Sequence, residues 1–156
     1  MGIEKAISQA KFRSVHQKAM LNILFTNGWI TEKVKRFLAP EDITPQQFNI
    51  LRILRGSYPK PLSTLQIRER MLDRMSDTSR LVDRLVSKQL AQKQTCATDR
   101  RLVDVLITEK GQALLEKLDS GVSHLDEIMT NLSEEEAETI SNLLDKLRDI
   151  DKDDKP

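Results

Sequence analysis

The sequence predicts a mainly α-helical protein that carries one small β-hairpin. Two observations lead to this fold class. Through most of the chain, apolar residues recur at intervals of three and four, which is the spacing of an amphipathic helix. Near residues 103–107 the apolar spacing changes to every second residue, as in a half-buried strand. The hairpin therefore interrupts a series of helices.

Length and composition indicate a globular protein. The chain has 156 residues, of which 38% are apolar and 31% are charged, as in one domain or a compact two-part protomer. It has neither an apolar run of about 18 residues nor the hydrophobic region of a signal peptide, so we expect no membrane span and a cytoplasmic location. A single cysteine, Cys96, allows no internal disulfide and no cysteine-rich zinc cluster.

The net charge of +1 is unevenly distributed. Residues 1–49 carry seven Lys/Arg and four Asp/Glu, residues 50–107 carry twelve and six, and residues 108–156 carry six and fourteen. The three parts therefore have net charges of +3, +6 and −8. Phosphate binding needs a local positive surface, so the basic middle favours a nucleic-acid-reading module.

The first helix is predicted from about Lys5 to Leu38. Asn27-Gly28 interrupts the pattern and Pro40 ends it. A helix of this length in a small protein either bends at Gly28 or extends into a partner subunit.

The next segments predict a helix-turn-helix. Thr44-Pro45-Gln46-Gln47 is a helix start that runs to Gly56, and Pro61-Leu62 follows as a short strand. Ser63-Thr64-Leu65-Gln66 starts a second helix, and a third runs from Ser76 to about Ser87.

The third helix and the hairpin together form the layout of a winged helix. The helix buries an apolar face and turns polar residues outward, with Arg80 and Arg84 one turn apart. A polar loop from Thr95 to Arg101 follows, and then a strand with Val103, Val105 and Ile107 on one face. A helix fits the DNA major groove, and a basic hairpin tip reaches a neighbouring minor groove. At that tip, the Asp99 carboxylate would hold an arginine in one pose.

Three motifs make the resemblance to a known family specific. They are Arg80-Leu81-Val82-Asp83-Arg84-Leu85, Thr98-Asp99-Arg100-Arg101-Leu102-Val103 and Leu106-Ile107-Thr108-Glu109-Lys110-Gly111. In this order and spacing, the chain from about Ser8 to Ile150 resembles the MarR (multiple antibiotic resistance regulator) family of bacterial winged-helix transcription regulators. It departs from that family's pattern at Gln89, where glycine is common, and at Asp77, where a neutral amide is common.

The resemblance implies a homodimer that reads an inverted repeat in double-stranded DNA, more as a repressor than as an activator. Arg101 would be the minor-groove arginine of the wing, with Asp99 as its orienting group. The expected DNA-binding residues are Ser76, Asp77, Ser79, Arg80, Arg84, Asp99, Arg100 and Arg101. The resemblance also implies release by a small aromatic compound. Phe25, Trp29 and Phe37 are the candidates for packing against it, and dimer core is the alternative role for each.

The C-terminal part predicts helices for dimerisation. One is expected from Thr108 to about Leu132 and another after the capping box Ser133-Glu134-Glu135-Glu136, each with a broad apolar stripe that a second copy would bury. The expected parts are an N-terminal dimerisation helix (1–43), a winged helix-turn-helix DNA-binding domain (44–108), C-terminal dimerisation helices (109–150) and a disordered acidic tail (151–156).

Other functions have weaker support in the sequence. His16 and His124 lack ligand-spaced partners, and no nucleophile or glycine-rich loop accompanies the acidic residues, so we expect no metal, no cofactor and no enzyme. Cys96 is either incidental or a redox-sensitive thiol beside Arg100 and Arg101. The second hypothesis is a protein-interaction module on a winged-helix scaffold that no longer binds DNA.

Overall fold

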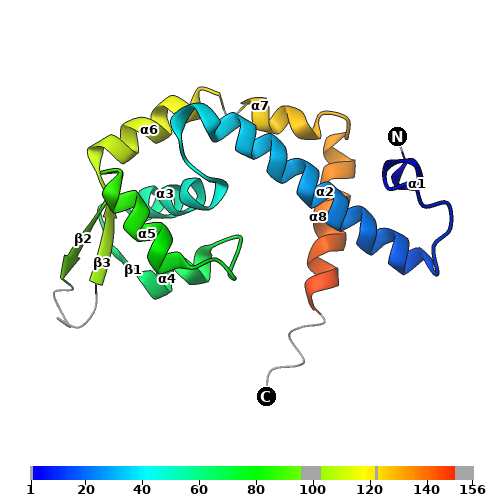
Figure 1. The fold of residues 1–156 in the computed structure, drawn as a ribbon, viewed down its shortest axis with the longest axis horizontal. Coiled ribbons are helices and arrows are strands. Elements are labelled where there is room, and N and C mark those ends of the chain that lie inside the picture. Colours follow the sequence, from blue (N-terminus) through cyan, green and yellow to red (C-terminus); the bar gives the residue numbers. More distant parts are fainter. Residues whose placement is uncertain (1, 96–102, 122, 150–156) are drawn as a thin grey trace, which may run out of the picture. The chain divides into compact units, whose positions relative to one another are not determined.

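The computed structural model describes residues 2–95, 103–121 and 123–149 (Figure 1). The chain divides into two compact units, residues 1–120 and residues 121–156, each of which is described by itself. The elements are α1 (Ile3–Ala6), α2 (Val15–Leu38), the 3-10 helix η1 (Ala39–Glu41), α3 (Pro45–Ser57), β1 (Leu62–Ser63), α4 (Thr64–Arg70), α5 (Thr78–Ser87), β2 (Ala91–Thr95), β3 (Val103–Ile107), α6 (Glu109–Asp119), α7 (Ser123–Asp126), the 3-10 helix η2 (Glu127–Met129) and α8 (Glu134–Arg148).

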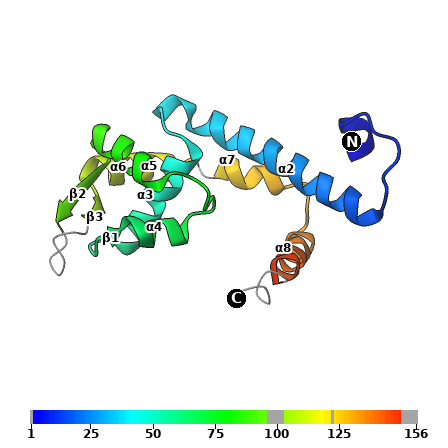
Figure 2. The ribbon, with the colours of Figure 1, turned by 60° about the horizontal axis from the view of Figure 1, so that its bottom comes forward.

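The predicted fold class is confirmed, since helices dominate and the described strands form one three-stranded antiparallel sheet in the order β1-β3-β2. The short strand predicted at Pro61-Leu62 is β1, and it places Leu62 opposite Val105. In β3, Val105 and Ile107 are buried while Val103 is largely exposed. The sheet lies beside α5 and α4 in both ribbon views (Figure 1, Figure 2). The helices and the sheet thus form a winged helix within residues 1–120.

Local capping fixes where three of the helices begin. At the start of α3, Gln47 N donates to Thr44 Oγ1 (3.2 Å) and Thr44 N donates to Gln47 Oε1 (3.1 Å). Ser63 and Gln66 make the same reciprocal pair before α4, at 3.2 and 2.9 Å. Each box satisfies backbone donors that a helix start otherwise leaves without partners. The predicted starts of α3, α4 and α8 are confirmed.

The prediction of a helix beginning near Lys5 and interrupted at Gly28 is wrong. The long helix α2 begins at Val15, because Ser14 caps it by accepting from Gln17 N at 3.1 Å. It then continues through Gly28 to Leu38 without a break. One glycine inside a helix costs only about 1 kcal/mol, which a helix of 24 residues tolerates.

The single helix predicted from Thr108 to Leu132 is also wrong. Helix α6 ends at Asp119, and α7 and η2 follow as separate short helices. Asp119, Ser120 and Gly121 are poor helix formers, and the Ser120 hydroxyl donates to the Lys117 carbonyl instead of leaving that acceptor to the helix.

One apolar core holds the winged helix together. It draws side chains from α3, α4, α5, the sheet and α6, including fully buried Ile50, Leu85 and Leu115. The compact unit ends at Ser120, twelve residues beyond the expected end of the DNA-binding domain at residue 108. Helix α6 is thus part of the winged-helix core.

The end of α5 has the form of a Schellman motif without glycine. Leu90 N donates to the Leu85 carbonyl and Gln89 N donates to the Val86 carbonyl, both at 2.9 Å. This arrangement needs a left-handed residue, and Gln89 supplies it with φ of 60°. The missing glycine noted in the sequence is therefore accommodated by a left-handed glutamine.

Replacing Gln89 by glycine is expected to stabilise the protein by about 0.5–1 kcal/mol, because glycine adopts the left-handed conformation without steric cost. Urea unfolding followed by circular dichroism measures the change. Ser87→Gly, two residues earlier inside α5, is the control and should destabilise by a similar amount. If Gln89→Gly destabilises as Ser87→Gly does, the left-handed cost at Gln89 is negligible.

Candidate nucleic-acid interface

Helix α5 presents a polar face to solvent. Thr78, Val82 and Leu85 are buried beneath it. The opposite face is exposed and carries Ser79, Arg80 and Arg84, three of the predicted DNA-binding residues, together with Asp83. The face has the shape and donors with which a recognition helix enters the major groove.

Helix α5 begins two residues later than predicted, at Thr78, because Asp77 is its N-cap. Asp77 Oδ1 accepts from Arg80 N at 3.2 Å. Its Oδ2 lies 3.2 Å from Arg80 Nε in an ion pair. Asp77 therefore satisfies the helix start and also holds the first arginine of the exposed face.

The turn before α5 is held by two polar side chains. Asn49 Oδ1 accepts from Leu72 N at 2.9 Å. Asp73 accepts from the Ser76 hydroxyl at 2.7 Å and from Met75 N at 3.1 Å, and these bonds, the Ser76 bond first, lower the pKa of the Asp73 carboxyl. The hydroxyl of Ser76, predicted to contact DNA, is thus engaged within the turn.

Internal partners engage some basic side chains in and next to the middle region and leave others without a partner among the described residues. One group is engaged by acidic residues, by carbonyl oxygens or by a hydroxyl. Its members are Arg55 with Asp119, Arg70 with Ser57, Lys88 with Asp42, Lys93 with Asp83 and Lys110 with the Lys88 carbonyl. The Arg55 pair is bidentate, at 2.6 and 3.2 Å, and it lowers the pKa of Asp119.

On and beside α4 and α5, the side chains of Arg68, Arg74 and Arg84 are exposed and form no hydrogen bond or ion pair with another described residue. Of these, only Arg84 was predicted as a contact. Arg68 on α4 and Arg74 in the turn between α4 and α5 were not among the predicted contacts. Their exposure distinguishes them from Arg55 and Lys88, whose partners are far away in the sequence.

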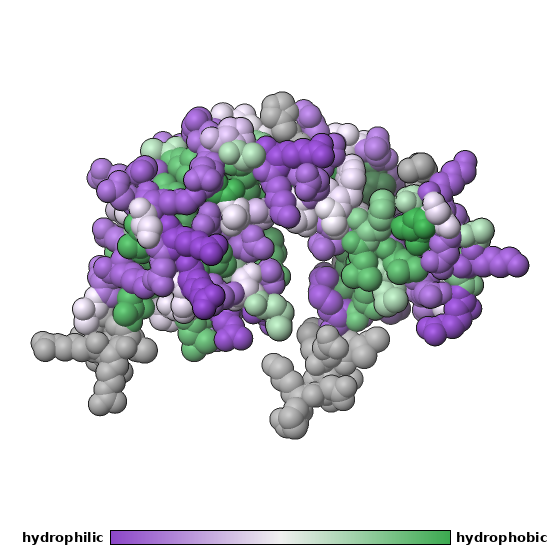
Figure 3. Space-filling model, in the orientation of Figure 1, coloured by the Kyte–Doolittle hydropathy of each residue, from purple (hydrophilic) through white to green (hydrophobic). Residues whose placement is uncertain are grey.

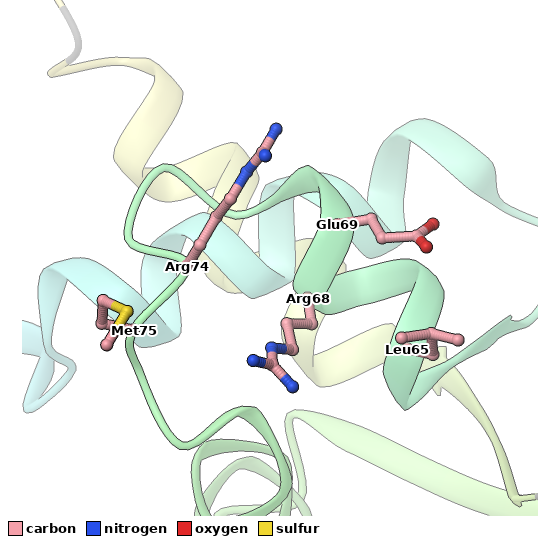
Figure 4. A pocket seen from close by; sticks show the side chains of 5 residues that line it. All are labelled: Leu65, Arg68, Glu69, Arg74 and Met75. Atoms are coloured by element: carbon pink, nitrogen blue, oxygen red, sulfur yellow. The ribbon is translucent and has the colours of Figure 1, made fainter. Parts of the chain in front are cut away.

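Arg68 and Arg74 line a shallow depression of about 260 Å³ together with Leu65, Glu69 and Met75. Figure 4 shows the Arg68 side chain extending from α4 into the space beside Met75, whereas Arg74 points away from it. A second depression joins Leu65 and Arg68 to the start of α5, including Ser79. The surface beside α5 therefore offers positive charge at two further positions.

Several predicted residues lie outside this surface. Cys96, Asp99, Arg100 and Arg101 fall outside the described residues. Phe25 and Trp29 are exposed, one turn apart on α2, and the Lys33 ammonium lies 5.6 Å from the Trp29 ring centroid.

The third aromatic candidate, Phe37, is partly buried against the winged-helix core. In the described parts of the chain, no three His, Cys, Asp or Glu side chains are placed to hold a metal ion. None of the described helices is long and apolar enough to cross a membrane.

Known proteins resemble this chain over the region that contains α3, α4 and α5. Residues 43–103, from before α3 to the start of β3, match the model of the MarR family. The chain is also 29% identical over 119 residues to the HTH-type transcriptional regulator MhqR of Bacillus subtilis (strain 168), covering 76% of this chain and 81% of that protein. Residues 43–103 thus match the MarR family, and the chain is similar to a MarR-type transcriptional regulator. The resemblance drawn from the sequence motifs is thereby confirmed.

Solved MarR structures share the fold. A MarR transcription factor from Planctomyces limnophilus is 29% identical, with a TM-score of 0.67 and coverage of 86% of this chain and 98% of that one. A cysteine-to-serine mutant of MarR from E. coli, complexed with operator DNA, is 25% identical with a TM-score of 0.76. The match covers 94% of this chain and 99% of that one. The MarR fold thus extends over both compact units of the chain.

Proposed function

We propose that this chain is a transcriptional regulator of the MarR type that binds operator DNA as a homodimer and acts as a repressor. The observation that carries the proposal is the outward face of α5, where the side chains of Arg84 and Ser79 are exposed and have no partner among the described residues, flanked by Arg68 and Arg74. Arginines in such a position bind guanine edges or phosphates. The operator complex of the E. coli relative supports the same assignment.

The geometry supports a role for individual residues within this proposal. Ser79, Arg80 and Arg84 would face the major groove from α5, and Arg68 and Arg74 would bind phosphates beside it. Ser76 would act mainly by ordering the turn through Asp73. Asp77 joins the set as the cap of α5, and the wing residues Asp99, Arg100 and Arg101 complete it by their motif in the sequence.

Dimerisation and ligand control belong to the same proposal. The parts 1–43 and 109–150 would bring two winged helices together, so that two copies of α5 read half-sites roughly 34–36 Å apart. A small aromatic ligand that changes this spacing would release the DNA, with Phe25, Trp29 and Phe37 as candidates for its contacts. Such a regulator acts in the cytoplasm and is not an enzyme.

The test is binding of the full-length protein to DNA upstream of its own and neighbouring genes, measured across a salt series. Wild type should prefer one fragment over random DNA, and its affinity should fall steeply as salt rises because bound phosphates release counterions. Arg84→Ala should lower affinity about 5- to 100-fold, as expected for one lost base or phosphate contact.

A charge-matched control separates the contact from a general charge effect. Arg13 is exposed and precedes α2, whose 24 residues span roughly 36 Å. Arg13→Ala should leave binding unchanged. If wild type prefers no fragment and Arg84→Ala matches Arg13→Ala, DNA binding is refuted, and the alternative of a protein-interaction module takes its place.

A further inference from the structure

We propose that Asp77 is a specificity-determining residue, which orients Arg80 toward guanine and weakens binding to DNA of any other sequence. The inference rests on the proposed function and assigns a role to a side chain that makes no contact with a base itself. It starts from the two oxygens of the Asp77 carboxylate, both of which are engaged by the same residue, Arg80.

The first oxygen builds the helix. Asp77 Oδ1 accepts from Arg80 N at 3.2 Å, which fixes the carboxylate at the first turn of α5. Serine and asparagine cap helices about as well as aspartate. The cap alone therefore does not require a carboxylate at this position.

The second oxygen restrains the arginine. Asp77 Oδ2 lies 3.2 Å from Arg80 Nε, although the Arg80 side chain is 82% exposed. Nη1 and Nη2 of Arg80 have no hydrogen-bond or ion-pair partner among the described residues. The carboxylate thus lies on the Nε side of the guanidinium, in an ion pair without hydrogen-bond geometry, and the two terminal nitrogens stay available to O6 and N7 of guanine.

The same carboxylate weakens DNA binding in which Arg80 does not contact a guanine. Phosphate is attracted to helix N-termini, and the Asp77 charge lies at the start of α5. It therefore repels backbone phosphates on any sequence. On the matching sequence this repulsion is offset, because the restrained Arg80 loses less freedom when it binds guanine.

The experiment compares full-length wild type, Asp77→Ser and Arg80→Ala in selection from a random pool of double-stranded DNA. Wild type should enrich a guanine at one position of each half-site, and Arg80→Ala should lose that preference. When that guanine is replaced by another base, the loss of affinity should be about two- to five-fold smaller for Asp77→Ser than for wild type. The effect is modest because exposed ion pairs are weak. Asp77→Ser should also bind random duplex about two- to five-fold more tightly.

The matched control is Glu69→Ser, which removes a carboxylate from the exposed surface of α4, where Glu69 pairs with no described residue. It should tighten binding to random DNA and leave the guanine preference unchanged. Thermal unfolding should confirm that Asp77→Ser folds. If Asp77→Ser does not fold, Asp77→Asn is used in its place, because asparagine also caps a helix and carries no charge.

The outcomes distinguish two failures. If wild type selects no sequence at all, the proposed function is wrong and this inference falls with it. If wild type is selective but Asp77→Ser keeps the full guanine preference, as Glu69→Ser does, only the role of Asp77 is overturned.

Discussion

Replacing Gly111 by alanine is expected to lower the free energy of unfolding by about 2 kcal/mol. Gly111 lies in the first turn of α6, directly against the backbone at the end of α5. A Cβ there would lie 2.2 Å from the Leu90 carbonyl oxygen and 2.8 Å from Ile107 Cγ1. That carbonyl already accepts from Thr108 N at 3.2 Å, so the backbone cannot move away without losing this bond.

Urea unfolding measures the effect, and Gly56→Ala in α3 is the matched control. A Cβ at Gly56 meets no atom within 4 Å, so that variant should gain up to about 1 kcal/mol from the better helix propensity of alanine. Opposite signs for the two variants would establish the close approach at Gly111. Equal gains would contradict it.

Local features of this fold could be predicted from the sequence. The capping boxes at Thr44, Ser63 and Ser133 involve residues only three apart, so their geometry is set by the sequence at each site. The alternation that predicted β3 reflects the burial of Val105 and Ile107. The boxes at Thr44 and Ser63 correctly positioned the starts of α3 and α4, whereas α5 begins two residues later than predicted.

Features that depend on a balance of weak terms could not be predicted. Gly28 suggests a break, but α2 continues because the cost of one glycine is spread over a long helix. Asp77 carries the mixed signals of a cap and of a base contact, and only its distances to Arg80 show that it caps.

The sequence also did not show which basic side chains are engaged by internal partners. Arg55 is engaged by Asp119, a residue 64 positions away, and Lys88 is engaged by Asp42, a residue 46 positions away. The net charge calculated from the sequence treats Arg55 and Lys88 in the same way as Arg68 and Arg74. Only the folded chain separates the engaged from the available ones, which is why two flanking arginines were missed.

Leu143→Arg is expected to convert the proposed homodimer into a monomer. Helix α8 exposes three large apolar side chains at helical spacing, Ile140, Leu143 and Leu147, and Leu143 is 60% exposed. Helix α2 also exposes apolar side chains (Figure 3). They are Val15, Met20, Ile23, Leu24, Phe25 and Trp29. Faces of this kind are normally buried against a partner.

Burying an arginine in such an interface without an acidic partner costs several kcal/mol. Sedimentation velocity at micromolar concentration should therefore give a dimer for wild type and a monomer for Leu143→Arg. Because one subunit then binds only one half-site, operator affinity should fall at least about 100-fold.

Leu72→Arg is the control for the change of residue type. Leu72 is 92% exposed in the turn before α5, and the same substitution there should leave the dimer intact. If Leu143→Arg sediments as wild type does, α8 is not part of the dimer interface, and Leu24→Arg then tests α2 in the same way. A monomeric wild type would instead mean that each subunit reads DNA alone, so that salt-dependent binding would persist at a single half-site.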